Sequence, residues 1–327
     1  MAAPLVRTGS AKLSSARSSY TARSVSARAP ARSVAARMAA AAVMSPERPA
    51  PVQEVAAPVS ADGPTVSVEA VRALEAELDT GRSVAALRRF NDALAALPSD
   101  VGELERRMEP VWAEFAYNLE SFNAVFTAVL LKVQLTIGVS DYVRRDEALQ
   151  GLIQPLAGEY GLHAAEPMGK THRKLFSEFY TSVTGKALPE LIRGGPSPDA
   201  AAELFAKMMS DVSNGGFCAD AVEEASYAMG YNLAVEYLAA PEKQWMLDSF
   251  KALSERVLAP AGRDVEWLFL EVHADGEPEH AAIGHQAVTT FVPEAHLPIL
   301  KRAIEDHDRD FAAFYNHLAE LLEQSEE

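Results

Sequence analysis

Apolar residues recur every three or four positions over most of the chain from Ser67 onward. Val68, Val71, Leu74 and Leu78 show this spacing within residues 68–78, and residues 84–97 repeat it. Such spacing places apolar side chains on one face of an amphipathic helix, and glycine or proline marks where a helix ends. By the same criteria, further helices are predicted at about 101–117, 119–138, 142–160, 170–184, 198–212, 218–238, 243–258, 263–292 and 295–323.

The segments between these predicted helices are short and carry glycine or proline, as in residues 193–198 and 213–216. No run of alternating apolar and polar residues with hairpin turn signals interrupts the helical pattern. The predicted fold class is therefore all-α, a multi-helical bundle. Residues 67–327 are numerous enough to form one large core and contain no second linker, so we predict a single domain there.

The first 44 residues differ in composition from the rest. They contain seven basic residues and no Asp or Glu, and serine and alanine occupy most other positions. A basic, serine-rich and acid-free start without an uninterrupted apolar stretch is typical of an organelle transit peptide. Frequent serine favours the chloroplast over the mitochondrion, so the expected location is the chloroplast stroma. Residues 45–66, rich in Pro, Ala and Val, are predicted to be a disordered linker.

This interpretation of the N-terminus predicts that a fluorescent protein fused behind residues 1–66 accumulates in plastids. The physical reason is the composition of the segment, which is basic and free of acidic residues as transit peptides are. Fluorescence microscopy of the fusion measures the outcome, and a uniform cytosolic signal would reject the targeting prediction.

The acidity of the remaining chain excludes some partners. The whole chain carries a formal net charge of −16 and residues 1–44 contribute +7, which leaves −23 for the rest. A body this acidic repels nucleic acids, so we expect no nucleic-acid binding. The longest stretch with almost no charge, Ser121–Ser140, is interrupted by Lys132 and suits a buried helix better than an integral membrane span. The single cysteine, Cys218, excludes an internal disulfide.

Histidine spacing gives the first indication of chemistry. All eight histidines follow residue 160, and His273, Glu277 and His280 stand at positions i, i+4 and i+7. At about 100° per residue, these positions lie within one narrow face of a helix. Two imidazoles and a carboxylate on one face form half of a metal site that suits iron or manganese.

Two other segments offer partners for this triplet. Glu236 ends an otherwise apolar helical run that starts at Tyr227, and His172 lies at the start of an amphipathic segment. A buried carboxylate is costly without a partner, and a metal ion is one partner that offsets the cost. Bundles that direct carboxylates and imidazoles inward from facing helices can hold two metal ions.

The order of these blocks resembles the haem-oxygenase-like diiron oxidases, a family of iron-containing redox enzymes with a TenA/PqqC-like helical bundle. The resemblance covers roughly residues 145–320, and its most specific part is the late triplet with Glu236 ahead of it. It implies a haem-oxygenase-like bundle that holds two iron ions, or iron and manganese, and activates dioxygen. The implied substrate is a small molecule derived from a fatty acid or an amino acid. A homodimer is compatible with this interpretation.

The resemblance also implies a set of ligands. These are Glu159 and His172 from the first region, Glu236 from the next helix, and His273, Glu277 and His280 from the later one. Two positions have alternatives. Glu159 lies far from His172 for one uninterrupted helix, so Glu166 competes with it. Pro278 and Gly276 predict a kink or break in the later helix, in which case Asp275 would replace Glu277.

Other functions fit the same fold class. Haem ligation through a proximal histidine on the first helix is excluded because no histidine precedes His163. A TenA-like hydrolase would use a nucleophilic cysteine, but we interpret Cys218 as a buried structural thiol. A metal-free bundle that binds a partner is the remaining alternative. Four histidines outside the implied ligand set are predicted to have surface or core roles without chemistry: His285, His296, His307 and His317.

Overall fold

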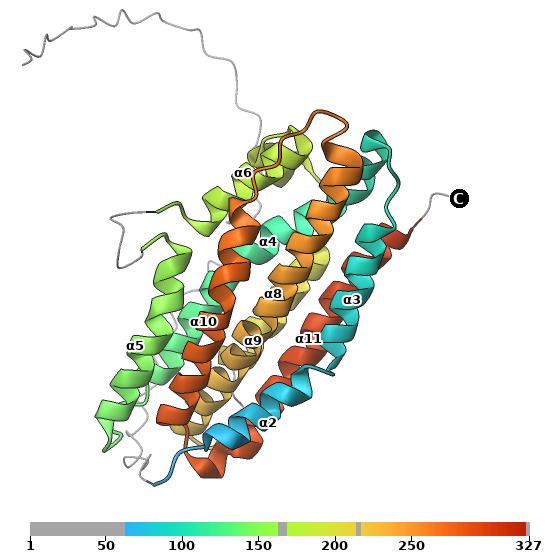
Figure 1. Cartoon of the computed structure of the whole chain (residues 1–327). Coiled ribbons are helices and arrows are strands. Elements are labelled where there is room, and N and C mark those ends of the chain that lie inside the picture. Colours follow the sequence, from blue (N-terminus) through green and yellow to red (C-terminus); the bar gives the residue numbers. More distant parts are fainter. Residues whose placement is uncertain (1–62, 163–168, 214–216, 325–327) are drawn as a thin grey trace, which may run out of the picture. The chain divides into compact units, whose positions relative to one another are not determined.

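The computed structural model describes residues 63–162, 169–213 and 217–324, with the backbone alone at 243 and 275–279 (Figure 1). The predicted transit peptide, residues 1–44, and the predicted linker up to residue 62 lie outside the described residues. The last four residues of that linker, 63–66, lie against the bundle. Val66 donates a backbone hydrogen bond to the carbonyl of Val292, 2.9 Å away, and its side chain is buried.

The described chain is an all-α, multi-helical bundle, which confirms the predicted fold class (Figure 1). Among the described residues, extended pairing is limited to one isolated bridge between Thr65 and Pro293. None of the described helices is both long and apolar enough to cross a bilayer. The α-helices are α2 (Val68–Leu78), α3 (Arg82–Ala95), α4 (Val101–Gln134), α5 (Tyr142–Glu159), α6 (His172–Thr184), α7 (Leu188–Gly194), α8 (Asp199–Ser213), α9 (Ala221–Leu253), α10 (Leu268–Phe291) and α11 (Leu297–Glu323).

Side-chain caps explain where several helices begin. The Asp100 carboxylate accepts a hydrogen bond from the Glu103 backbone N–H at 2.8 Å, and the Thr171 hydroxyl accepts one from Lys174 at 3.2 Å. Such N-caps satisfy backbone donors that a helix start leaves without a partner. The Thr171 cap matters for the site, because it fixes His172 as the first residue of α6.

Two predicted helix breaks are absent. The segments predicted at 101–117 and 119–138 form the single helix α4, and those at 218–238 and 243–258 join in α9 across Pro241. Proline inside a helix removes one backbone hydrogen bond and costs about 3 kcal/mol. Burial of Leu238 and Phe250, on either side of Pro241, offsets such a cost because both pack into the core. The sequence pattern therefore predicted a helix boundary at a position where tertiary packing maintains one continuous helix.

Helix α9 contacts α4, α10 and α11. Residue pairs between α9 and α11 rise together along the chain, from Tyr227 with Asp306 to Glu242 with Tyr315, so these helices run parallel. Helices α9 and α10 run antiparallel, because the earlier residue of α9, Glu236, pairs with the later residue of α10, His280, at 3.7 Å. Lys251, later in α9, pairs with Glu271, earlier in α10, at 3.3 Å. The three helices therefore lie side by side, and α9 is shared by both contacts.

A glycine brings α9 and α11 unusually close together. A Cβ atom on Gly230 would lie 3.1 Å from both the Cα and the carbonyl oxygen of Leu300. Because those atoms belong to the main chain, they cannot move aside as the end of a flexible side chain can. The two helices consequently meet through their backbones at this point.

Candidate metal centre

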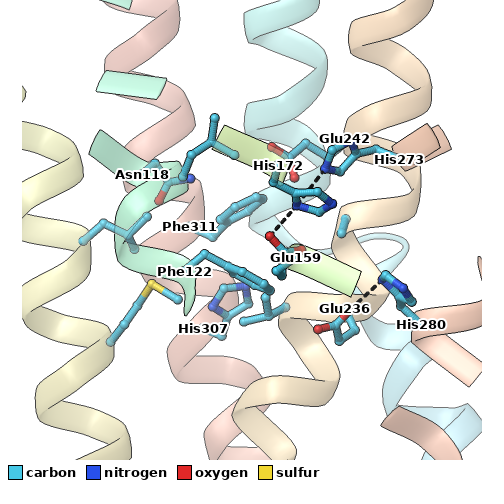
Figure 2. A pocket seen from close by; sticks show the side chains of 15 residues that line it. Asn118, Phe122, Glu159, His172, Glu236, Glu242, His273, His280, His307 and Phe311 are labelled. Atoms are coloured by element: carbon cyan, nitrogen blue, oxygen red, sulfur yellow. Dashed lines mark hydrogen bonds and ion pairs between the residues drawn. The ribbon is translucent and has the colours of Figure 1, made fainter. Parts of the chain in front are cut away.

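One pocket inside the bundle collects most of the polar side chains of interest (Figure 2). Its volume is about 70 Å³, which accommodates several water-sized groups but is smaller than the roughly 150 Å³ of a cavity that holds benzene. Its three carboxylates and three of its four imidazoles come from α5, α6, α9 and α10, and the fourth imidazole, His307, comes from α11. The other lining residues belong to α4, α8, α9 and α11. The described lining residues are Asn118, Leu119, Phe122, Glu159, His172, Leu204, Met208, Val235, Glu236, Ala239, Glu242, His273, His280, His307 and Phe311.

Five of the six predicted ligands line this pocket. Glu159 is the last residue of α5, His172 is the first residue of α6, and Glu236 lies inside α9. His273 and His280 both belong to α10 and line the pocket. The chain thus brings together residues more than one hundred positions apart.

The sixth predicted ligand, Glu277, has a side chain outside the described residues. Its backbone lies within α10, between the two histidines. The side chain of its competitor Asp275 lies outside the described residues as well, and so does Glu166, the competitor of Glu159. Of these alternatives, the structure places only Glu159 in the pocket.

The predicted break at Pro278 does not occur, because α10 continues from Leu268 to Phe291. Pro278 has no backbone N–H, so the helix loses one hydrogen bond there. Burial of Leu270 before the proline and of Ala287 after it offsets this loss, because both residues pack into the bundle. Over an unbroken helix, positions 273 and 280 differ by only about 20° around the axis. The same-face relation inferred from spacing therefore holds along the observed backbone.

Three of the predicted ligands form one contact cluster. A carboxylate oxygen of Glu159 contacts Nδ1 of His172, and the same Nδ1 lies 3.2 Å from Nε2 of His273. The two imidazole rings have centroids 4.1 Å apart. Figure 2 shows the three side chains directed toward one another. Their donor atoms therefore converge on one region of the pocket.

A backbone carbonyl sets the tautomer of His273. Nδ1 of His273 contacts the carbonyl oxygen of Phe269 one turn earlier, and the residue is only 5% exposed. A carbonyl oxygen can only accept, so Nδ1 carries the proton and the neutral ring presents the lone pair of Nε2. Histidines that bind metals are commonly oriented in this way by a partner on the other ring nitrogen.

The other two ligands form a second pair. Nδ1 of His280 lies 3.7 Å from a carboxylate oxygen of Glu236, which is only 2% exposed. This is an ion-pair distance when the imidazole is protonated. Figure 2 shows the pair on a different part of the pocket from the cluster around His172. Two groups of donors thus face the same space.

Two further ionisable residues of the pocket were missed from sequence. Glu242, 6% exposed, accepts a hydrogen bond from the Tyr315 hydroxyl, and His307 is 1% exposed on α11. His307 had been assigned no chemistry. A signal was present, since His307 continues the apolar spacing of Ile304 and Phe311 at three and four residues, which places it on the buried face of α11.

The charges of the pocket require compensation. It holds three carboxylates, from Glu159, Glu236 and Glu242, and no Lys or Arg belongs to its described lining. Buried carboxylates are costly unless protons, histidinium or a cation balances them. Among the described side chains, no three His, Cys, Asp or Glu residues already stand at the spacing needed to hold an ion. The donor types nonetheless fit iron or manganese, which bind carboxylate and imidazole together.

Cys218 takes no part in this pocket. It lies half-buried ahead of α9, and burial, with the nearby carboxylates of Glu223 and Glu224, raises the pKa of its thiol to about 11. A thiol with a raised pKa is a poor nucleophile at neutral pH. This supports its interpretation as a structural residue and gives no support to a cysteine-dependent hydrolase.

Comparison with known proteins supports the fold. A CADD-like protein of unknown function from Nostoc punctiforme PCC 73102 matches with a TM-score of 0.57 and 12% sequence identity, over 78% of this chain and 94% of that one. A second structure of the same description gives a TM-score of 0.45 and 15% identity, over 73% and 97% of the two chains. No family model and no curated protein matches the chain. At such identity the likeness shows a shared helical-bundle fold.

Proposed function

We propose that this chain is a non-haem iron-dependent oxidase related to the haem-oxygenase-like diiron oxidases. The observation that carries the proposal is the lining of the pocket, where three carboxylates and four imidazoles meet without a Lys or Arg among the described residues. That composition fits divalent cations as the compensating charge. The fold shared with a CADD-like protein is compatible with this function.

The proposed ligands are Glu159, His172 and His273, with Glu236 and His280. Glu277 completes the proposed set, because its backbone lies between His273 and His280 in α10. We propose that this set holds two iron ions, or one iron and one manganese. Iron held by carboxylates and imidazoles with open positions supplies the reaction with dioxygen and the oxidising power.

The chain itself contributes orientation and exclusion of water. The Phe269 carbonyl keeps the proton of His273 on Nδ1, so that Nε2, which lies 3.2 Å from Nδ1 of His172, carries the lone pair that a metal would bind. The Tyr315 hydroxyl, fully buried, donates to Glu242 and holds that carboxylate at the edge of the pocket. Apolar side chains make up most of the lining that α4, α8 and α11 supply. Exclusion of water by these apolar side chains would protect an oxidising centre from side reactions.

The substrate that we propose is a small molecule, derived from a fatty acid or an amino acid, and the volume of about 70 Å³ requires that only a small part of it enters the pocket. A purely metal-free binding function would leave the pocket carboxylates to be balanced by protons. Metal analysis separates the two functions.

The full chain, loaded anaerobically with ferrous iron and freed of excess metal, is expected to retain up to two ions per chain. His273→Ala or His280→Ala should abolish or halve this content, since each removes an imidazole from one of the two donor groups. Elemental analysis gives the metal-to-protein ratio, and circular dichroism confirms that each variant is helical.

The matched control is His285→Ala. His285 belongs to the same helix, α10, but pairs with Glu75 at 2.9 Å and does not line the pocket. Its replacement should leave the metal content unchanged. Folded wild-type protein without bound iron or manganese would remove the oxidase proposal and favour the metal-free binding function.

A further inference from the structure

His307 stands out in the part of the pocket lining that α4, α8 and α11 supply. Most of that lining is apolar, with Phe122 from α4, Met208 from α8 and Phe311 from α11. Asn118 is the other polar residue there and is partly exposed, whereas His307 is 1% exposed. Figure 2 shows His307 among the side chains that line the pocket. A fully buried imidazole thus faces the pocket from a mostly apolar surface.

Neither ring nitrogen of His307 has a hydrogen-bond partner among the described residues. Its neighbours are aromatic rings: Tyr231 at 4.9 Å and Phe311 at 5.2 Å between centroids. Native structures satisfy the large majority of buried polar side-chain atoms, so an exception requires a physical explanation. The aromatic neighbours would pack equally well against leucine or phenylalanine, so packing alone does not account for an imidazole.

We propose that His307 is a substrate-binding residue that hydrogen-bonds an uncharged polar group, such as a hydroxyl, on a small and otherwise apolar substrate. This inference rests on the proposed function in so far as the pocket is the active site. The imidazole of His307 would hold the substrate from the α11 side of the pocket. The carboxylates and the other histidines, on α5, α6, α9 and α10, would face the substrate from the other side.

The chemistry of the lining selects that class of ligand. Burial lowers the pKa of His307 to about 3, so the ring is neutral at physiological pH and offers one donor and one acceptor. A hydroxyl group, which both donates and accepts, can pair with either ring nitrogen. A free carboxylate would gain no ion pair with a neutral imidazole and would meet the carboxylates of Glu236 and Glu242 in the same pocket. The proposal therefore favours an alcohol over the corresponding acid.

The test uses three probes of similar length: 1-propanol, 1-chloropropane and propionate. Each is titrated into metal-free, full-length protein, and dissociation constants are taken from NMR shifts of the pocket side chains. Wild-type protein should bind 1-propanol more tightly than either of the other probes. His307→Leu should weaken 1-propanol binding about five- to tenfold, the value of one hydrogen bond, and leave 1-chloropropane within about twofold.

Two further variants sharpen the test. His307→Gln retains a donor and an acceptor and should keep most of the preference for the alcohol. His317→Leu lies on the same helix, α11, but outside the pocket, and should leave all three affinities unchanged. The melting temperature of His307→Leu should equal or exceed that of wild type, because the change removes two buried nitrogens without partners. A structural histidine would instead lower it.

The inference is overturned if 1-propanol binds no better than 1-chloropropane, or if His307→Leu weakens both equally. The binding test uses no iron, so it is independent of the oxidase proposal. Alcohol binding without iron retention would leave a ligand-binding pocket that is not an oxidase. Iron retention without a role for His307 would leave an oxidase whose substrate is positioned by other residues.

Discussion

Iron-loaded protein with Glu236→Ala is expected to lose most of its reaction with dioxygen. Glu236 is almost fully buried in the pocket and lies 3.7 Å from His280. Neutral imidazoles alone do not offset the charge of two divalent ions, so removal of one carboxylate should lower occupancy or leave the metal unreactive. Changes to residues that only support metal ligands already cost about 10–100-fold in affinity or activity. We therefore expect a loss of at least about tenfold.

The measurement is dioxygen uptake after rapid mixing of the anaerobic ferrous protein with oxygenated buffer, followed also by visible absorption. It is run alone and with a panel of fatty acids, amino acids and alcohols, because bound substrate commonly completes an active site. Glu224→Gln is the control, since Glu224 lies on the same helix but pairs with Lys132 outside the pocket at 2.7 Å. Fully loaded wild-type protein that is inert under every condition would show that the metal is structural or hydrolytic.

Trp112→Ala is expected to lower the free energy of unfolding by about 3–5 kcal/mol, the usual cost of truncating a buried aromatic residue. Trp112 is 2% exposed and stacks on Phe250 of α9, with ring centroids 5.5 Å apart. It also contacts Phe176 and Tyr180 of α6, at 6.2 and 5.7 Å. The loss should reduce the melting temperature by roughly 6–20 °C, which calorimetry measures.

The Trp112→Ala substitution should also disturb the position of His172 in the pocket. Phe176 lies one helical turn after His172, so Trp112 holds the end of α6 from which His172 extends. Trp245→Ala is the matched control, because Trp245 is only partly buried and has Arg88 over its ring at 5.6 Å. We expect it to cost about 1 kcal/mol and to leave metal content unchanged. Equal destabilisation by the two variants would contradict the central role assigned to Trp112.

The sequence was sufficient to predict the fold class and the shared helix face of His273 and His280 in α10. Both follow from local periodicity, because spacing alone determines which residues share a helix face. Helix boundaries were predicted less well, since Pro241 and Pro278 lie inside helices that tertiary contacts maintain. The cost of about 3 kcal/mol for a proline inside a helix is readily outweighed by the burial of apolar residues on both sides of it.

The candidate site was predicted in part for a similar reason. The contact between His172 and His273 joins residues 101 positions apart, and the family resemblance suggested it where the sequence pattern alone could not. Glu242 and His307 were missed because each lies on an amphipathic helix where either burial or exposure is reasonable. Their position depends on how α9 and α11 are rotated against each other, which is a property of the packed bundle and not of either segment.

The close contact between Gly230 and Leu300 bears on how the size of substrate that the pocket accepts can change during evolution. The contact joins the two parallel helices α9 and α11, about two turns before Glu236 on the one and His307 on the other. The distance between Glu236 and His307 is therefore set by a main-chain contact outside the pocket. Side chains can change rotamer to admit a larger substrate, but two backbones in contact cannot move apart in this way. The residue at position 230 therefore acts as a spacer, and a broader pocket can evolve there while every side chain that touches the substrate stays the same.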